Sequence, residues 1–236
     1  MRATSGASGG VNTGTEESAI RAAQESQLTP RQRERRQRIL SAARQLTAER
    51  GYDGVSMREI ATAAQVAEKT LYNIYVTKDR LIALAAQDRT ERVFAGAFEE
   101  ARGAGLKFLL HLPAKMAEVT LQSPAMARAL SQVLLEHSEL VGLDSVYLTY
   151  VGAALEDMCK EGLLDSRLPL TIHVRLIRLY FVATVVLWAR EEIGDSELAD
   201  HLSLRLCEAL LPIAREPLAR RLQKEARTRL RRLSAT

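Results

Sequence analysis

The stretch from Ser56 to Lys78 constrains the fold more than any other part of the 236-residue chain. Ser56 favours the position before a helix, and Glu59, three residues later, completes a capping box. Apolar residues then recur at the spacing of one helix face until a break near Gln65. Residues 68–75 have the composition of a second short helix. The pattern predicts two short helices joined by a tight turn.

Composition favours helices in the rest of the chain as well. The chain has only 13 glycines and 6 prolines, too few for a fold built from many turns, and its commonest residue types favour helices. We therefore expect an all-α fold in which an N-terminal three-helix helix-turn-helix domain is fused to a C-terminal helical bundle. The expected divisions are a disordered tail at 1–28, the helix-turn-helix domain at 29–78, the bundle at 79–216 and a basic tail at 217–236.

Caps and prolines set the expected helix limits. Thr29 and Pro30 open a first helix that Gly51 ends. Further helices are expected at 68–75, 78–102, 106–122 with a kink or break at Pro113, 124–140, 144–164, 170–193 and 196–211. The helix at 170–193 is apolar on nearly every side, so it should be buried on both faces. Its apolar run from 176 to 189 is too short to span a bilayer.

Basic charge is concentrated in two segments. Residues 30–50 carry seven arginines against two glutamates, and residues 217–236 carry seven basic side chains against one glutamate. The first segment adjoins the helix-turn-helix, so we favour an arm that lies along phosphates over a merely solvated helix end. For the second segment we favour a solvated helical extension over a second nucleic-acid contact.

The second short helix presents a polar face. On a helical wheel Lys69 and Asn73 point away from the packed side, which is expected to hold Leu71, Ile74 and Tyr75. Lysine can donate to guanine and asparagine can pair with adenine in the major groove of DNA. Thr70 can offer its methyl group to thymine, and Tyr72 lies where it would reach a phosphate.

The start of the following helix offers a further phosphate contact. Lys78 would bring its charge to free backbone N–H groups at this helix N-terminus. The full set predicted to contact nucleic acid is Arg31, Arg33, Arg35, Ser56, Met57, Ala67, Lys69, Thr70, Tyr72, Asn73 and Lys78.

This stretch resembles the DNA-binding domain of the tetracycline-repressor (TetR) family of bacterial transcription regulators. The matching residues are Ile39, Ala42, Ala43, Gly51, Tyr52, residues 55–61, Ala64, Val66, residues 70–72, Tyr75, Lys78 and Leu81. The chain departs from the family at Gln65, Ala67, Lys69 and Ile74, and at Tyr75 it has a tyrosine where the aromatic residue is usually phenylalanine. Lys69 replaces a common glycine on the surface that faces the bases.

The resemblance implies a homodimer that binds a palindromic DNA operator. It places the dimer interface on the helices between Leu170 and Leu211, and it implies a small apolar or amphipathic effector that binds in the C-terminal domain and releases the DNA. The candidate pocket residues are Phe94, Phe98, Phe108, Met116, Met126, Tyr147, Tyr150 and Trp188. Each of them is also an ordinary core residue.

Other functions find less support in the sequence. We expect no metal and no cofactor, because His111, His137 and His173 have no metal-ligand spacing and no phosphate-binding glycine loop occurs. For the same reason we expect that the protein is not an enzyme. The two cysteines and the lack of a signal-peptide core predict a cytoplasmic protein without a membrane partner. A helical protein-interaction module that uses the helix-turn-helix only as scaffold remains the alternative.

Overall fold

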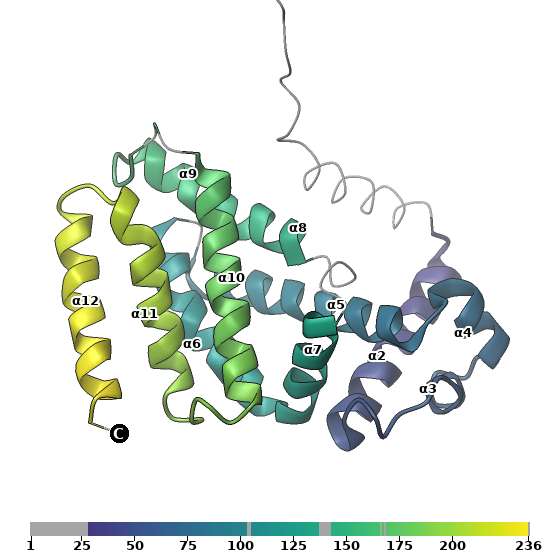
Figure 1. The fold of residues 1–236 in the computed structure, drawn as a ribbon. Helices are drawn as coiled ribbons and strands as arrows, with labels where there is room; N and C mark the ends of the chain where they lie inside the picture. The colour runs from purple at the N-terminus through teal and green to yellow at the C-terminus, as the bar shows by residue number, and fades with distance from the viewer. Residues whose placement is uncertain (1–27, 103–104, 137–142, 166, 168, 236) are drawn as a thin grey trace, which may run out of the picture.

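The computed structural model describes residues 28–102, 105–136, 143–165, 167 and 169–235. The segment expected to be a disordered tail lies almost wholly outside these ranges. Within them the chain is all-α, as predicted, and its strand-like structure is limited to one isolated bridge between Leu164 and Ala214. The helices form an elongated molecule in which α3 and α4 lie at one end and α12 at the other (Figure 1).

Three helices form the N-terminal domain: α2 (Pro30–Arg50), α3 (Met57–Ala63) and α4 (Glu68–Tyr75). Their predicted limits are confirmed, and side-chain caps open α2 and α3, whereas α4 has no side-chain cap. The Thr29 hydroxyl accepts the Gln32 backbone N–H at 3.3 Å, and the Gln32 side chain accepts the Thr29 N–H at 2.8 Å. The same reciprocal pair opens α3 at Ser56 and Glu59.

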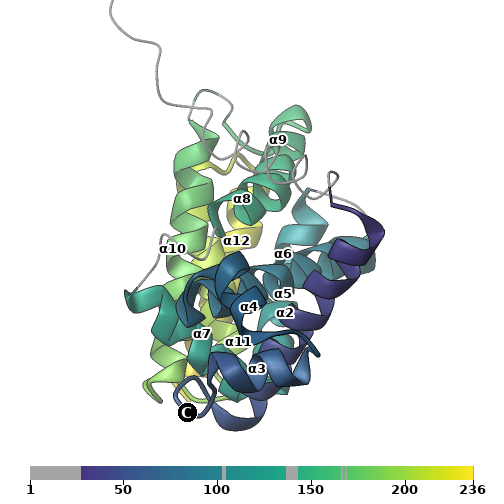
Figure 2. The ribbon, with the colours of Figure 1, turned by 90° about the vertical axis from the view of Figure 1, so that its right-hand side faces the viewer.

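The C-terminal domain begins with α5, which packs against α6, α7 and α8, and the helices α10, α11 and α12 lie beyond them at the far end of the molecule (Figures 1 and 2). Its elements are α5 (Lys78–Glu100), α6 (Leu106–Gln122), α7 (Pro124–Glu136), α8 (Leu143–Tyr147), the π-helical segment η2 (Leu148–Gly152), α9 (Ala153–Lys160), α10 (Leu170–Ala189), α11 (Leu198–Leu210), the 3₁₀ segment η3 (Leu211–Ile213) and α12 (Leu218–Leu233). Helix α2 packs against both α5 and α7, so the two domains share an interface.

Several predicted helix limits in this domain need correction. A break at Pro113 is wrong, because α6 runs through it; Pro113 and its neighbour Leu112 are buried where α6 packs on α11. The helix expected at 144–164 contains the π-helical segment and ends at Lys160, before Gly162 adopts a positive φ of 74°. The helix expected to reach residue 193 ends at Ala189.

Helix α10 is buried on one face only. Val174, Ile177 and Phe181 pack into the core, whereas Leu179 is 57% exposed and Ile172 and Leu187 are exposed beside it. The expectation of burial on both faces is therefore wrong for a single chain. The apolar run from 176 to 189 is too short for a membrane span, but the whole helix α10 has the length and hydropathy of one. A core helix of a soluble protein passes the same test.

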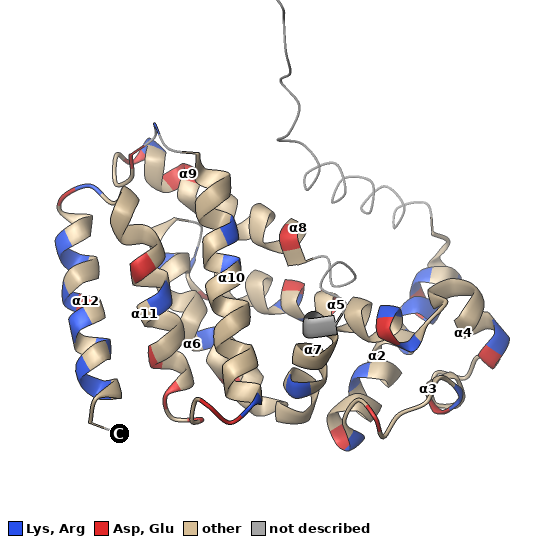
Figure 3. Cartoon of the chain, in the orientation of Figure 1, with Lys and Arg blue, Asp and Glu red and all other residues tan. Residues whose placement is uncertain are grey.

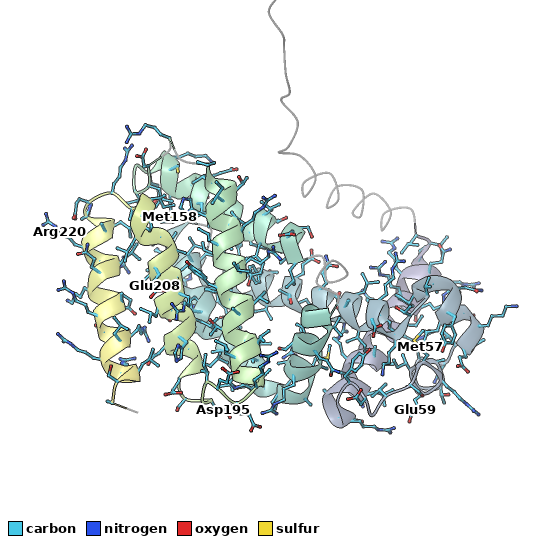
Figure 4. All side chains as sticks on the ribbon, in the orientation of Figure 1. Met57, Glu59, Met158, Asp195, Glu208 and Arg220 are labelled. Carbon is cyan, nitrogen blue, oxygen red and sulfur yellow. The ribbon has the colours of Figure 1, made fainter. Side chains whose placement is uncertain are left out.

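The basic segment after Pro217 is a packed helix. Leu218, Leu222 and Ala226 of α12 are buried against α11. The Arg229 guanidinium forms ion pairs with Asp200 of α11 and with Glu225, each at 2.5 Å. The favoured interpretation of a solvated tail therefore holds only for the exposed residues of α12, where Lys and Arg recur along the helix (Figure 3) and Arg220 extends outward (Figure 4).

Candidate nucleic-acid interface

Helix α4 is anchored along one side and open along the other. Leu71 and Tyr75 are buried against α3 and α5, and the opposite side exposes Lys69, Tyr72 and Asn73. These three side chains lie on the surface, as the helical wheel predicted, whereas Thr70 is half-buried at its edge. Ala67, the N-cap, is exposed and makes no side-chain cap bond. Helix α4 lies at the end of the molecule that is nearest the viewer in Figure 2.

Ile74 does not belong to the packed side. It is 42% exposed, so its predicted burial is wrong. An eight-residue helix presents only two turns to its neighbours, and here Leu71 and Tyr75 make the packed contacts. Ile74 therefore adds an apolar side chain to the surface beside Asn73.

Two strained backbone positions frame α4. Gln65 adopts a φ of 55° in the turn that precedes the helix. Val76, directly after it, has φ 65° and ψ −51°, and the Thr77 N–H donates to the Tyr75 carbonyl at 2.7 Å. This is the rare γ-turn, which strains a β-branched residue. It turns the chain sharply from α4 into α5.

The start of α3 contributes less to the surface than predicted. Met57 is only 5% exposed and packs in the core, so its side chain cannot contact DNA. The Ser56 hydroxyl donates to the Glu59 carboxylate at 2.7 Å and accepts the Glu59 N–H at 3.3 Å. The bonds that the carboxylate accepts from the Ser56 hydroxyl and from the Ser56 backbone N–H, the latter at 2.9 Å, hold the pKa of the Glu59 carboxyl below its usual value. Figure 4 places Met57 and Glu59 on α3.

Lys78 links the loop between α2 and α3 to the start of α5. Its ammonium group donates to the carbonyls of Tyr52 at 3.0 Å and Val55 at 3.2 Å, and it lies 4.0 Å from the centre of the Tyr52 ring. The loop between α2 and α3 is thereby tied to the first residue of α5. Two of the three ammonium protons are used, which leaves at most one for a phosphate.

The first turns of α2 form a basic surface next to α4. Arg31 and Arg33 are exposed and Arg35 is half-buried, and none of the three forms an ion pair within the described part of the chain. Tyr75 lies beneath them with its hydroxyl buried and unbonded among the described residues. Burial raises the pKa of this hydroxyl, and the positive charges of Arg36 and Arg35 oppose the rise.

A second site lies inside the C-terminal domain, between α5, α6, α7, α8 and α10. It is an apolar cavity of about 80 Å³. Three of the predicted pocket residues line it: Phe94, Met116 and Tyr147. The remaining lining residues, which the sequence did not single out, are Arg89, Thr90, Val93, Val119, Thr120, Ala127, Leu130, Leu143, Phe181, Val182 and Val185.

The other predicted pocket residues lie around this cavity. Phe98, Phe108 and Tyr150 pack with Phe94 in an aromatic cluster whose ring centres are 5.8 to 6.4 Å apart. Met126 lines a separate groove between α2, α5 and α7. Trp188 does not line the cavity, because its indole N–H donates to Asp195 at 2.7 Å near the end of α10. No group of three or more potential metal ligands occurs within the described ranges.

Sequence comparisons point to one family. The sequence profile of the bacterial regulatory proteins, tetR family, matches residues 39–85. The HTH-type transcriptional repressor KstR of Mycolicibacterium smegmatis is 26% identical over 180 residues, which cover 73% of this chain and 85% of that protein. KstR of Mycobacterium tuberculosis is 41% identical over 64 residues, covering 27% of this chain and 29% of that protein.

Solved structures share the fold. Thermus thermophilus FadR, described as a TetR-family transcriptional repressor and solved with lauroyl-CoA, aligns with a TM-score of 0.60 at 25% identity, covering 74% of this chain and 93% of its own. A TetR transcriptional regulator from Rhodococcus sp. RHA1 aligns with a TM-score of 0.59 at 20% identity, covering 75% and 97%. The helix-turn-helix and the helical C-terminal domain therefore both have counterparts of known structure.

Proposed function

Because the chain belongs to the tetR family of bacterial regulatory proteins, whose members bind DNA and regulate transcription, we propose that it is a homodimeric, ligand-responsive repressor. It binds a palindromic operator through its helix-turn-helix and leaves the DNA when a small molecule occupies the C-terminal domain. One observation carries this proposal above the others: α4 exposes a row of polar side chains opposite a fully packed face. Such a short, rigidly held helix suits the major groove.

The contacts divide into two kinds. Lys69 and Asn73 reach base edges and carry the sequence preference, and Ile74 gives an apolar contact for a thymine methyl group next to them. Tyr72 and the arginines of the first α2 turns bind phosphates and fix the orientation of the domain. Lys78 contributes through the backbone N–H groups at the α5 N-terminus, since its ammonium group already binds two carbonyls.

The dimer forms around α10. Ile172, Leu179 and Leu187 expose an apolar stripe along this helix, and such a stripe on a folded domain marks an interface. Helix α11 contributes less than the predicted Leu170–Leu211 interface assumed, because its large apolar residues are already buried by α6, α10 and α12. Two-fold symmetry places two α4 helices side by side on the DNA and selects a palindrome.

The effector enters the apolar cavity. Its lining supports a molecule with an apolar portion, and the T. thermophilus FadR relative was solved with lauroyl-CoA, which has an apolar acyl chain. The chain needs no catalytic group for this function, so we propose that it is not an enzyme. A regulator that binds operators acts where bacterial DNA lies, which places it in the cytoplasm.

Selection of bound duplexes from a random pool tests the proposal. We expect an enriched palindrome whose half-sites lie about one helical turn of DNA apart. The Lys69→Ala variant should lose preference at specific base pairs, and Lys107→Ala, an exposed lysine on α6 far from α4, should select the same sequence as the unmodified protein. If no sequence is enriched at moderate salt, the repressor proposal fails.

A further inference from the structure

An open groove at the junction of α2, α5 and α7 is lined by three arginines. Arg44 comes from α2, and Arg89 and Arg92 come from α5. The other lining residues carry no charge: Ser41, Gln45, Ala48, Ser123 and Met126. Asp88 binds Arg44 and also Arg92, the latter at 2.6 Å, and it balances one of the three positive charges. The groove therefore keeps an excess of positive charge.

Arg89 is the least compensated of the three. Its guanidinium donates to the Val119 carbonyl at 2.5 Å, in the last turn of α6, and no carboxylate pairs with it within the described residues. A guanidinium has five N–H donors, and among the described residues Arg89 uses one of them, in its bond to Val119. Burial lowers the Arg89 pKa, and the charges of Arg44 and Arg92 lower it further. The negative charge of an anion in the groove would oppose this lowering of the Arg89 pKa.

The same arginine also lines the apolar cavity. Arg89 is common to the cavity and to the groove, and Met126 of the groove is adjacent in sequence to Ala127 of the cavity. An apolar space and a cluster of cations thus meet at one side chain. This arrangement fits a ligand with an apolar tail and an anionic head better than a wholly apolar one.

We infer that the effector is an amphipathic acid whose tail fills the cavity and whose carboxylate or phosphate head binds Arg44, Arg89 and Arg92. The inference rests on the proposed ligand-responsive function and names the class of its ligand. The cavity of about 80 Å³ is smaller than the roughly 150 Å³ cavity that holds benzene in an engineered protein, so the tail must widen it. Widening moves α5 and α7, the two helices on which α2 packs.

The head group also gives a direct route to the DNA-binding domain. Arg44 belongs to α2, whereas Arg89 and Arg92 belong to α5. The ion pair between Arg44 and Asp88 of α5 is one of the contacts that join the two domains. An anion that competes with Asp88 for Arg44 replaces this link by a new one and shifts α2 on α5. Ligand binding therefore changes the contact between α2 and α5 directly.

Calorimetric titration of the full-length protein with three probes tests the inference. Octanoate, octyl phosphate and octan-1-ol share one tail and differ in head group. We expect octanoate or octyl phosphate to bind at least roughly tenfold more tightly than the alcohol, as for hydrogen bonds to a charged group. Comparison of the two acids tells a carboxylate head from a phosphate head. If the alcohol binds as tightly as both acids, or if none of the three binds, the inference is overturned.

Variants locate the head-group site. Arg89→Gln should remove the preference for the acid while the alcohol still binds, and Arg89→Lys should restore part of it. Arg44→Gln provides the same test on α2 if Arg89→Gln does not fold. Arg227→Gln, an exposed arginine on α12, should bind octanoate as the unmodified protein does. If Arg89→Gln and Arg44→Gln weaken acid and alcohol equally, the arginines serve only the structure and the inference is wrong.

Operator binding separates this inference from the proposed function. A protein that enriches a palindrome but shows no preference for an acid remains a repressor with a different class of effector. A protein that binds octanoate through Arg89 but enriches no DNA sequence retains the site and loses the repressor proposal. The expected result is both, with octanoate lowering the affinity for the selected duplex in the unmodified protein and not in Arg89→Gln.

Discussion

Replacement of Lys78 by methionine distinguishes a structural lysine from a phosphate-binding one. The substitution keeps most of the side-chain length and removes the ammonium group that donates to the Tyr52 and Val55 carbonyls at 3.0 and 3.2 Å. Each hydrogen bond to a charged donor contributes about 1.5–3 kcal/mol, and we take about half of this because Lys78 is half-exposed. The cation–π contact with Tyr52 adds about 0.5–1 kcal/mol.

The loss of stability should therefore be about 2–4 kcal/mol. In a chain of this size 1 kcal/mol corresponds to roughly 2–4 °C in Tm, so thermal unfolding followed by circular dichroism should show a fall of roughly 4–16 °C. The control is Lys69→Met, which removes an exposed lysine from α4 and should leave Tm unchanged.

The salt dependence of DNA binding supplies the second measurement. Loss of a phosphate contact reduces the slope of log K against log salt by about 0.9 per protomer. A lysine that holds the loop between α2 and α3 should leave this slope unchanged at temperatures where Lys78→Met is folded. An unchanged Tm together with a shallower slope would refute the structural role and restore the phosphate contact.

Four further changes test other parts of the structure. Asn73→Ala should cost about 1–3 kcal/mol at one base pair of each half-site and little elsewhere, as measured by competition binding with single-base variants. Leu222→Ala should lower the free energy of unfolding in urea by about 2–4 kcal/mol, and Leu230→Ala on the exposed face of α12 by less than about 0.5 kcal/mol; equal effects would mean that α12 does not pack on α11. Leu179→Glu should convert the dimer to a monomer in sedimentation equilibrium, and a dimer that persists would place the interface away from the α10 stripe. Val76→Gly should raise the urea midpoint by releasing about 1 kcal/mol of strain, whereas a clear loss of stability would show that the γ-turn is not strained.

The helix limits that were predictable from sequence depend on contacts between near neighbours. The reciprocal bonds of Thr29 with Gln32 and of Ser56 with Glu59 involve residues three apart, so their spacing in the chain reveals them. The cap at Thr77 is equally local. The positions of the short helices followed for the same reason, whereas the all-α class followed from a composition with few glycines and prolines.

The misplaced residues depend on contacts that sequence spacing does not contain. Ile74 lies near the boundary of the packed face of α4, and only the packing of α4 on α3 and α5 decides that it is exposed. The burial of Met57, in contrast, follows from the helical spacing of Met57, Ile60 and Ala64. Lys78 was predicted to bind a phosphate because the two carbonyls that accept from it lie more than twenty residues earlier, where local sequence spacing does not reveal them. Arg89 resembles any arginine on a solvated helix until the groove and the cavity are known.

Repeated leucines in the sequence predicted the C-terminal helix α12, but they did not predict that it packs on α11. Leu218 and Leu222 are spaced for one helix face, which predicts an amphipathic helix. The surface that receives them is on α11, and nothing in the local pattern of α11 indicates that its outer side is covered. The predicted interface therefore included a helix that this chain already buries.

In the proposed dimer, the helix α12 that covers α11 would also affect how the protein responds to its own abundance. A dimer joined mainly through α10 buries less apolar surface than one joined through two helices of each protomer, and its association is weaker accordingly. At concentrations below the dissociation constant, dimer abundance follows the square of the chain concentration, so a doubling of synthesis gives about four times as much dimer. Operator occupancy would then report the rate at which the cell makes the regulator, even when the amount of effector is constant.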